Sequence, residues 1–185
     1  AMTVYVQPTD SDAVTSTKTA LGASNMRYGV LKLGNAYGSE LLPLYVPVTA
    51  MYWSGSAWLP NSLDSTTSIS ASNITVGHRK SNLLTNNPAL GITIPVTTLS
   101  SGQAAIKIAA PGQGNIGSVD IAVSLGPTGA STSCATSPSQ LPNAASGANM
   151  TWLRGNWCGG TYANDPSATA TFGAAKSPYY YRRER

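Results

Sequence analysis

The sequence predicts an all-β fold: an antiparallel β-sandwich, or a flattened barrel, with a long loop pinned by a disulfide. Three observations lead to this prediction. Apolar and polar residues alternate over several short segments, which is the period of a half-buried strand. Clusters of Gly, Pro, Asn and Ser separate these segments and predict turns. The two cysteines both lie in one long polar stretch.

Two strand-like runs come first, on either side of a Gly/Asn-rich turn within residues 27–53. The second run, residues 45–53, contains Pro47, and a later run contains Pro95. Proline has no N–H to donate to a ladder, so both residues predict edge strands or bulges.

The segment Trp-Ser-Gly-Ser-Ala-Trp at residues 53–58 predicts a hairpin tip that carries Trp53 and Trp58 on its two arms. Aromatic residues on an exposed tip are better placed for contact with a partner than for core packing. We therefore expect a binding surface at these two tryptophans. The alternative is that one or both of them cap the open end of the sandwich.

Three further segments alternate clearly, at residues 92–97, 104–109 and 119–125. In the last segment four apolar residues share the face that we expect to pack in the core: Val119, Ile121, Val123 and Leu125. The residues between them are expected to face water: Asp120, Ala122 and Ser124.

Residues 131–149 differ from the rest of the chain because they are rich in Ser, Ala, Pro and Asn and poor in large apolar groups. We interpret them as a long surface excursion. Residues 150–153 then predict a strand or a short helical turn. Residues 167–172 and 178–183 predict a closing hairpin.

Cys134 and Cys158 are predicted to form a disulfide that ties this excursion back. Zinc binding would need further ligands, the single histidine is distant in sequence, and no Cys-x-x-Cys redox motif is present. Closing a loop of this length would contribute about 3–4 kcal/mol in the chain-entropy treatment. A structural disulfide indicates an oxidising compartment, the periplasm or the cell surface.

Charged residues make up only 10% of the chain, which is a low value typical of surface and fibre proteins. Half of the net charge of +4 lies in the last four residues, so no clustered basic face is predicted and no nucleic-acid partner is expected. No apolar run reaches the roughly 18–20 residues of a membrane span. We expect a lead-in strand region in residues 1–25 and one compact β domain in residues 26–185.

The acidic residues and the histidine each have an ordinary structural interpretation. Asp64 and Asp165 resemble turn residues that cap nearby backbone amides. Asp120 is expected to be solvated, and His78 is expected to be exposed in a loop. The sequence therefore predicts no catalytic residue, no metal ligand and no cofactor. A glycan-acting enzyme would need two converging carboxyl groups, and no motif here indicates them.

The stretch that begins Arg-Tyr-Gly-Val-Leu-Lys-Leu-Gly-Asn-Ala-Tyr-Gly resembles the C-terminal domain of the MshQ family. This family belongs to the mannose-sensitive haemagglutinin type IV pilus system of Gram-negative bacteria. The remaining motifs of the resemblance are at residues 52–55, 61–65, 152–154, 165–173 and 181–184. The family often has a cysteine after the Asp-Ser of its middle motif, where this chain has Thr66.

The resemblance implies an exported, pilus-associated or cell-surface domain of a Gram-negative bacterium that passes through the periplasm. It implies no catalytic residues. We therefore expect a non-enzymatic extracellular domain that acts in adhesion or in pilus or surface-fibre assembly, with protein partners or a glycan. The alternative is a purely structural module that packs against neighbouring subunits or domains.

Overall fold

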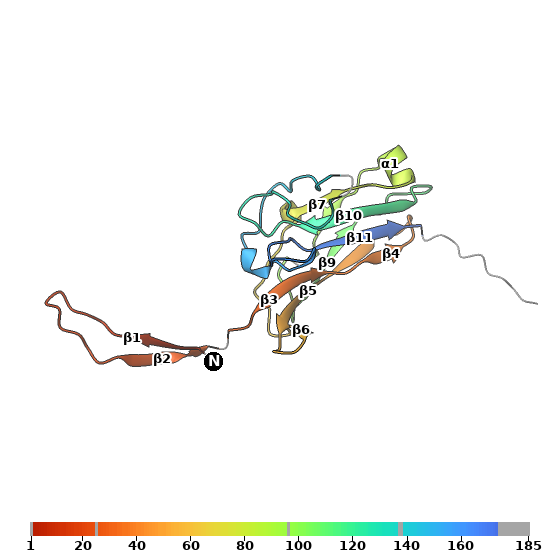
Figure 1. The fold of residues 1–185 in the computed structure, drawn as a ribbon. Coiled ribbons are helices and arrows are strands. Elements are labelled where there is room, and N and C mark those ends of the chain that lie inside the picture. Colours follow the sequence, from red (N-terminus) through yellow and green to blue (C-terminus); the bar gives the residue numbers. More distant parts are fainter. Residues whose placement is uncertain (1, 25, 96, 137–138, 174–185) are drawn as a thin grey trace, which may run out of the picture.

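The computed structural model describes residues 2–24, 26–95, 97–136 and 139–173 (Figure 1). Within these ranges the chain is mostly strand and almost free of helix, as the alternating pattern predicts. The strands are β1 (Met2–Val6), β2 (Thr19–Ser24), β3 (Gly29–Leu33), β4 (Ala36–Gly38), β5 (Leu44–Trp53), β6 (Trp58–Pro60), β7 (Ile74–Gly77), β8 (Ile92–Thr93), β9 (Gln103–Ile108), β10 (Gly117–Val123) and β11 (Ser167–Phe172). The short helical pieces are η1 (Ala71–Asn73), α1 (Asn82–Asn86) and η2 (Thr151–Leu153).

Two sheets form the body of the domain and face each other as the layers of a sandwich (Figure 1). One sheet has the order β4-β11-β10-β7, and the other has the order β3-β5-β9-β8 with β6 paired to β5. The two sheets do not close into a barrel, so the sandwich form of the prediction is confirmed. A third, separate sheet is the β1–β2 hairpin.

Alternation along the strands fills the space between the two sheets. On β5, Val46, Val48 and Ala50 are buried while their neighbours face outward. On the opposite sheet, Ile121 of β10 and Phe172 of β11 are fully buried in the same apolar cluster. The core therefore comes from residues that are far apart in sequence but share the strand period.

The edge-strand prediction for Pro47 is wrong. Pro47 lies in β5, which pairs with β3 on one side and with β9 on the other without a shift in register. The carbonyl of Pro47 accepts a hydrogen bond from the Gly34 amide at 2.9 Å. In an antiparallel strand a residue's N and O face the same neighbour, so the missing N–H faces β3 just after it ends at Leu33. The proline therefore interrupts no ladder bond. Pro95, by contrast, follows the edge strand β8, where proline is tolerated.

One pairing departs from the expected antiparallel arrangement. β11 pairs with β10 in antiparallel fashion but with β4 in parallel fashion, with Ala170 opposite Ala36 and Phe172 opposite Gly38. The last strand of the described chain is thus inserted between two earlier ones. The predicted partner of β11 at residues 178–183 lies outside the described residues.

The outer face of β10 is covered, which contradicts the expectation that Ala122 and Ser124 face water. Both side chains are fully buried. The Ser124 hydroxyl donates to the carbonyls of Thr128 and Ala130, both at 3.0 Å. The segment that follows β10 therefore folds back over the sheet and is not a simple surface excursion. Leu141 of this segment is itself buried.

Candidate functional site

The long segment between β10 and β11 is held closed by the predicted disulfide. Cys134 and Cys158 are bonded, with their Cα atoms 5.5 Å apart, which confirms the pairing inferred from the sequence. Residues 151–153 form the short turn η2, so the helical turn that was one of the two predictions for residues 150–153 is confirmed. Trp157 comes directly before Cys158, and Tyr162 lies four residues beyond it.

Asp165 ties the two ends of this segment together. Its oxygens accept hydrogen bonds from the backbone amides of Leu125 at 3.1 Å and Thr132 at 2.9 Å, and from Arg154 Nε at 2.9 Å. The sequence predicted a turn residue that caps nearby backbone amides. Asp165 does accept from backbone amides, but the local turn is wrong, because Leu125 and Thr132 are distant in sequence and Asp165 is completely buried. Its role is structural.

Asp120 and His78 are not the exposed residues that the sequence predicted. Asp120 Oδ2 lies 3.0 Å from His78 Nδ1, and Asp120 Oδ1 accepts a hydrogen bond from the Thr169 hydroxyl at 2.8 Å. The His78 side chain is only 5% exposed. The prediction failed because the neighbouring strands β7 and β11 bring partners to Asp120 across the sheet.

The predicted hairpin tip is present between β5 and β6, and Trp53 pairs directly with Trp58 across the two strands. Ser54 closes the tip: its amide and hydroxyl both donate to the Ala57 carbonyl at 2.9 Å, and its hydroxyl accepts from the Ala57 amide. Gly55 has a φ of +104°, which favours glycine at this position. The tip thus holds the two tryptophans in fixed register.

Four aromatic rings form a continuous row that starts at this tip, and we call it the aromatic row: Trp53, Trp58, Tyr28 and Tyr162. Neighbouring ring centroids are separated by 5.6, 5.6 and 5.4 Å. The rings are tilted or edge-on to one another, an arrangement that aromatic pairs favour. The row joins three regions of the chain: the β5–β6 tip, the residue before β3, and the segment between β10 and β11. We call this segment, residues 124–166, the disulfide-closed segment.

The aromatic row is open to solvent. Trp53 is 43% exposed, Tyr28 is 48% exposed and Tyr162 is 50% exposed, whereas Trp58 is half-buried between its neighbours. Neither tryptophan of the tip is therefore a buried cap of the sandwich. Exposed aromatic groups in contact with one another form a rigid amphipathic surface, because their mutual packing limits their side-chain freedom.

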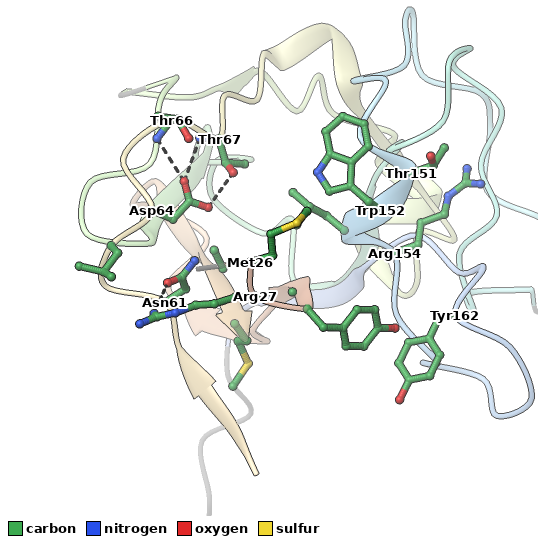
Figure 2. A pocket seen from close by; sticks show the side chains of 16 residues that line it. Met26, Arg27, Asn61, Asp64, Thr66, Thr67, Thr151, Trp152, Arg154 and Tyr162 are labelled. Atoms are coloured by element: carbon green, nitrogen blue, oxygen red, sulfur yellow. Dashed lines mark hydrogen bonds between the residues drawn. The ribbon is translucent and has the colours of Figure 1, made fainter. Parts of the chain in front are cut away.

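A pocket of about 570 Å³ adjoins the row, and Tyr28 and Tyr162 belong to its wall (Figure 2). Asp64 with Thr66 and Thr67 forms one side, and Thr151 and Trp152 of η2 form the opposite side (Figure 2). Trp152 is well exposed to solvent. The pocket therefore combines apolar surface with fixed polar groups, the usual composition of a ligand site.

The polar groups of the pocket are held in place. The Arg27 guanidinium lies over the Tyr52 ring, 4.2 Å from its centroid, and donates to Asn61 Oδ1 at 2.9 Å. Asp64 accepts hydrogen bonds from the Thr66 and Thr67 amides and from the Thr67 hydroxyl. The sequence prediction that Asp64 caps local amides is confirmed.

Two groups of the site have shifted pKa values. Burial by itself would raise the pKa of Asp64, but the hydrogen bonds from Thr67 and Thr66 outweigh it and lower the pKa below its usual value of 3.8. Burial raises the pKa of the Tyr28 hydroxyl above its usual value of 10.0, and the neighbouring Tyr162 adds to this effect. Asp64 is therefore a carboxylate and Tyr28 a neutral hydroxyl at neutral pH.

Sequence reasoning found one end of this site and missed the other. It singled out Trp53 and Trp58 because they flank a recognisable tip. It did not associate Tyr28, Trp152 or Tyr162 with them, because these residues approach the tip only through β3 pairing and the disulfide-closed segment. The one available signal was the position of Tyr162 shortly after the second cysteine.

The family described as "DUF6701, fourth domain" matches residues 27–185. The chain belongs to this family. Neither a curated protein nor a solved structure matches the chain. The aromatic row lies entirely inside the DUF6701 match, and so does the pocket wall except for Met26. The β1–β2 hairpin precedes the match. Among the described residues, no helix is long and apolar enough to cross a lipid bilayer.

Proposed function

We propose that this DUF6701 domain is a non-enzymatic adhesion module that binds carbohydrate along the aromatic row and in the adjoining pocket. The observation that carries the proposal is the contact of four aromatic rings, three of them exposed, next to a pocket of about 570 Å³. The flat apolar faces of sugar rings stack on aromatic side chains.

The polar groups around the row suit sugar hydroxyls. Arg27 is a fixed donor, Asn61 offers an amide beside it, and the Tyr28 hydroxyl, whose pKa is raised, can both donate and accept. Asp64 already accepts three hydrogen bonds from its own loop. Its role is therefore to shape the pocket wall rather than to act as an acid or base.

The cellular setting that we propose is the surface of a Gram-negative bacterium, in a protein associated with a type IV pilus. The supports are the disulfide, which forms in oxidising compartments, the low proportion of charged residues, and the resemblance to the MshQ family. In this setting a domain exported through the periplasm would present the aromatic row to host, surface or matrix glycans.

A glycan-array screen followed by calorimetric titration of the selected oligosaccharides tests the proposal. The double variant Trp53→Ala, Trp58→Ala is expected to weaken binding at least tenfold, which corresponds to about 1.4 kcal/mol. Tyr45→Ala is the matched control, because Tyr45 is exposed on the same strand β5 but lies outside the row and the pocket. It should bind normally.

Thermal unfolding of the same variants separates binding from packing. We expect the double tryptophan variant to lose more adhesion than thermal stability. A large fall in melting temperature, with unchanged adhesion of the protein that remains folded, would instead show that the tryptophans stabilise the fold and do not bind a ligand. Failure of every oligosaccharide to bind the native protein would refute the carbohydrate proposal directly.

A second candidate function is assembly with neighbouring subunits. Its specific support lies beside β4, the edge strand of its sheet, where Tyr37 is 67% exposed and Leu41 and Leu42 of the following loop are also exposed. An edge strand with exposed apolar groups can accept a further strand from a partner. In sedimentation experiments Tyr37→Lys should abolish concentration-dependent association if assembly is the primary role, and it should leave glycan binding unchanged.

A further inference from the structure

The β1–β2 hairpin is a two-stranded sheet without a core. Within the part of the chain that the structure describes, β1 pairs only with β2, and every residue from 3 to 23 is exposed. The hairpin extends away from the sandwich, as Figure 1 shows on its left side. An isolated two-stranded hairpin is at best marginally stable in water, and a third strand or a covering layer is needed for independent stability. The hairpin therefore lacks the third strand or covering layer that a stable sheet needs.

The two faces of the hairpin differ in chemistry. Val4 and Val6 of β1 share one face because side chains alternate along a strand. Tyr5 lies on the other face, where the Lys18 ammonium sits 4.6 Å from its ring centroid. The first face carries the two valines opposite Gly22 and Thr19, and no described residue packs on it, while the second carries a charge that suits solvent. This is the asymmetry of a sheet that is covered on one side.

The hairpin contains a β-bulge in β2. The register shifts between Val4 and Tyr5, because Val4 pairs with Gly22 and Tyr5 with Ala20, which leaves Leu21 of β2 unpaired. Bulges bend a strand and increase its twist, and they are over-represented at sheet edges and at the rims of barrels. Among the described residues, no apolar core lies around the hairpin.

We propose that the β1–β2 hairpin completes the sheet of the preceding DUF6701 domain of the same polypeptide, with its Val4/Val6 face turned toward that domain's core. The family match begins at residue 27, so the hairpin lies outside the matched residues. The description "fourth domain" implies that DUF6701 proteins contain further domains, and we take the third to be the neighbour on the N-terminal side. The hairpin would join the two domains through backbone hydrogen bonds as well as through the chain, and it would orient the aromatic row relative to its neighbour.

Hydrogen exchange compares the chain of residues 1–185 with the longer natural protein that includes the preceding domain. In the chain alone, amides of residues 3–6 and 19–23 should exchange at close to unprotected rates, whereas amides of β5 and β10 should be protected. In the longer protein the same hairpin amides should exchange at least about 100-fold more slowly. Equal exchange in the two proteins would overturn the proposal.

A matched pair of substitutions identifies the face. Val4→Asp places a charge on the apolar face of β1, and Val14→Asp places the same charge at an exposed position between the two strands. In the longer protein only Val4→Asp should lower the unfolding temperature of the preceding domain. In the chain of residues 1–185 neither substitution should alter the unfolding of the sandwich. Equal effects of the two substitutions in the longer protein would contradict the assigned face.

Two other occupants of the apolar face are distinguishable. Protection of the hairpin in the chain alone that increases with protein concentration would show pairing with a second copy. Protection in the chain alone that is independent of concentration would show docking onto its own sandwich. Either result overturns the proposal. Because the hairpin lies outside the aromatic row, neither result bears on carbohydrate binding.

Discussion

The buried carboxylate of Asp165 provides the most direct test of how the long segment after β10 is held in place. It accepts hydrogen bonds from the amides of Leu125 and Thr132 and from Arg154 Nε, and it is completely buried. We predict that Asp165→Asn, which conserves the size of the side chain, lowers the free energy of unfolding by about 2–4 kcal/mol.

The magnitude follows from the three donors. An asparagine has one acceptor oxygen where the carboxylate has two, so at least one of the amides faces an NH₂ group and loses its partner. A buried donor without a partner costs about 1–3 kcal/mol. Loss of the negative charge also weakens the contact to Arg154, although that side chain is 17% exposed and keeps access to water. For a protein of this size, about 2–4 kcal/mol corresponds to a fall of about 4–16 °C in melting temperature.

Urea unfolding monitored by tryptophan fluorescence measures the change, with Asp64→Asn as the control. Asp64 also accepts two amide hydrogen bonds, but it lies in the partly exposed pocket wall, so we expect a smaller loss of about 1 kcal/mol. Arg154→Ala combined with Asp165→Asn should cost less than the sum of the two single variants, because they share one contact. A loss below about 0.5 kcal/mol for Asp165→Asn would refute the assigned role.

Three further predictions concern the pocket wall, the core and the disulfide. The folded-state pKa of Asp64 is lowered, so this group contributes stability that is present above its usual value of 3.8 and is lost as the pH falls through the lower folded value. Urea unfolding measures the difference in stability between the native protein and Asp64→Asn. The pH-dependent part of this difference should vanish in acid. A difference that grows on acidification would contradict the direction of the pKa shift. Ile121→Ala removes a fully buried side chain and should cost about 2–5 kcal/mol in the same assay. Mass spectrometry of the exported protein should show it two hydrogens lighter than its reduced form, and reduction of Cys134–Cys158 should lower stability by about 3–4 kcal/mol; two free thiols would exclude the structural role.

Alternation was sufficient to predict the strands that form the core. In β9, Ile106 and Ile108 alternate with partly exposed residues, and the burial pattern of β11 follows the same period. These predictions succeeded because successive side chains of a strand point to opposite faces, so neighbouring residues in the sequence define both faces. The β5–β6 tip was equally local, since Ser54 and Gly55 determine its geometry within four residues.

Contacts between a residue and the residues of other strands could not be predicted from alternation along one strand. Pro47 in a central strand is tolerated only because β3 ends beside it, and Asp120 is shielded only because β7 and β11 flank it. The covering of Ala122 and Ser124 has the same origin, because the segment that covers them has no strand or helix period of its own. Local pattern carries no information about what lies across a sheet.

The sequence by itself determined the all-β class, the core strands, the hairpin tip with its two tryptophans, and the disulfide. Each of these depends on residues that are close in sequence or on the pairing of the only two cysteines. Only the tertiary structure decided that Tyr28 and Tyr162 extend the tryptophan pair into the aromatic row beside a pocket. The physical reason is that contacts between distant segments depend on strand register and on the path of the disulfide-closed segment, and side-chain periodicity specifies neither.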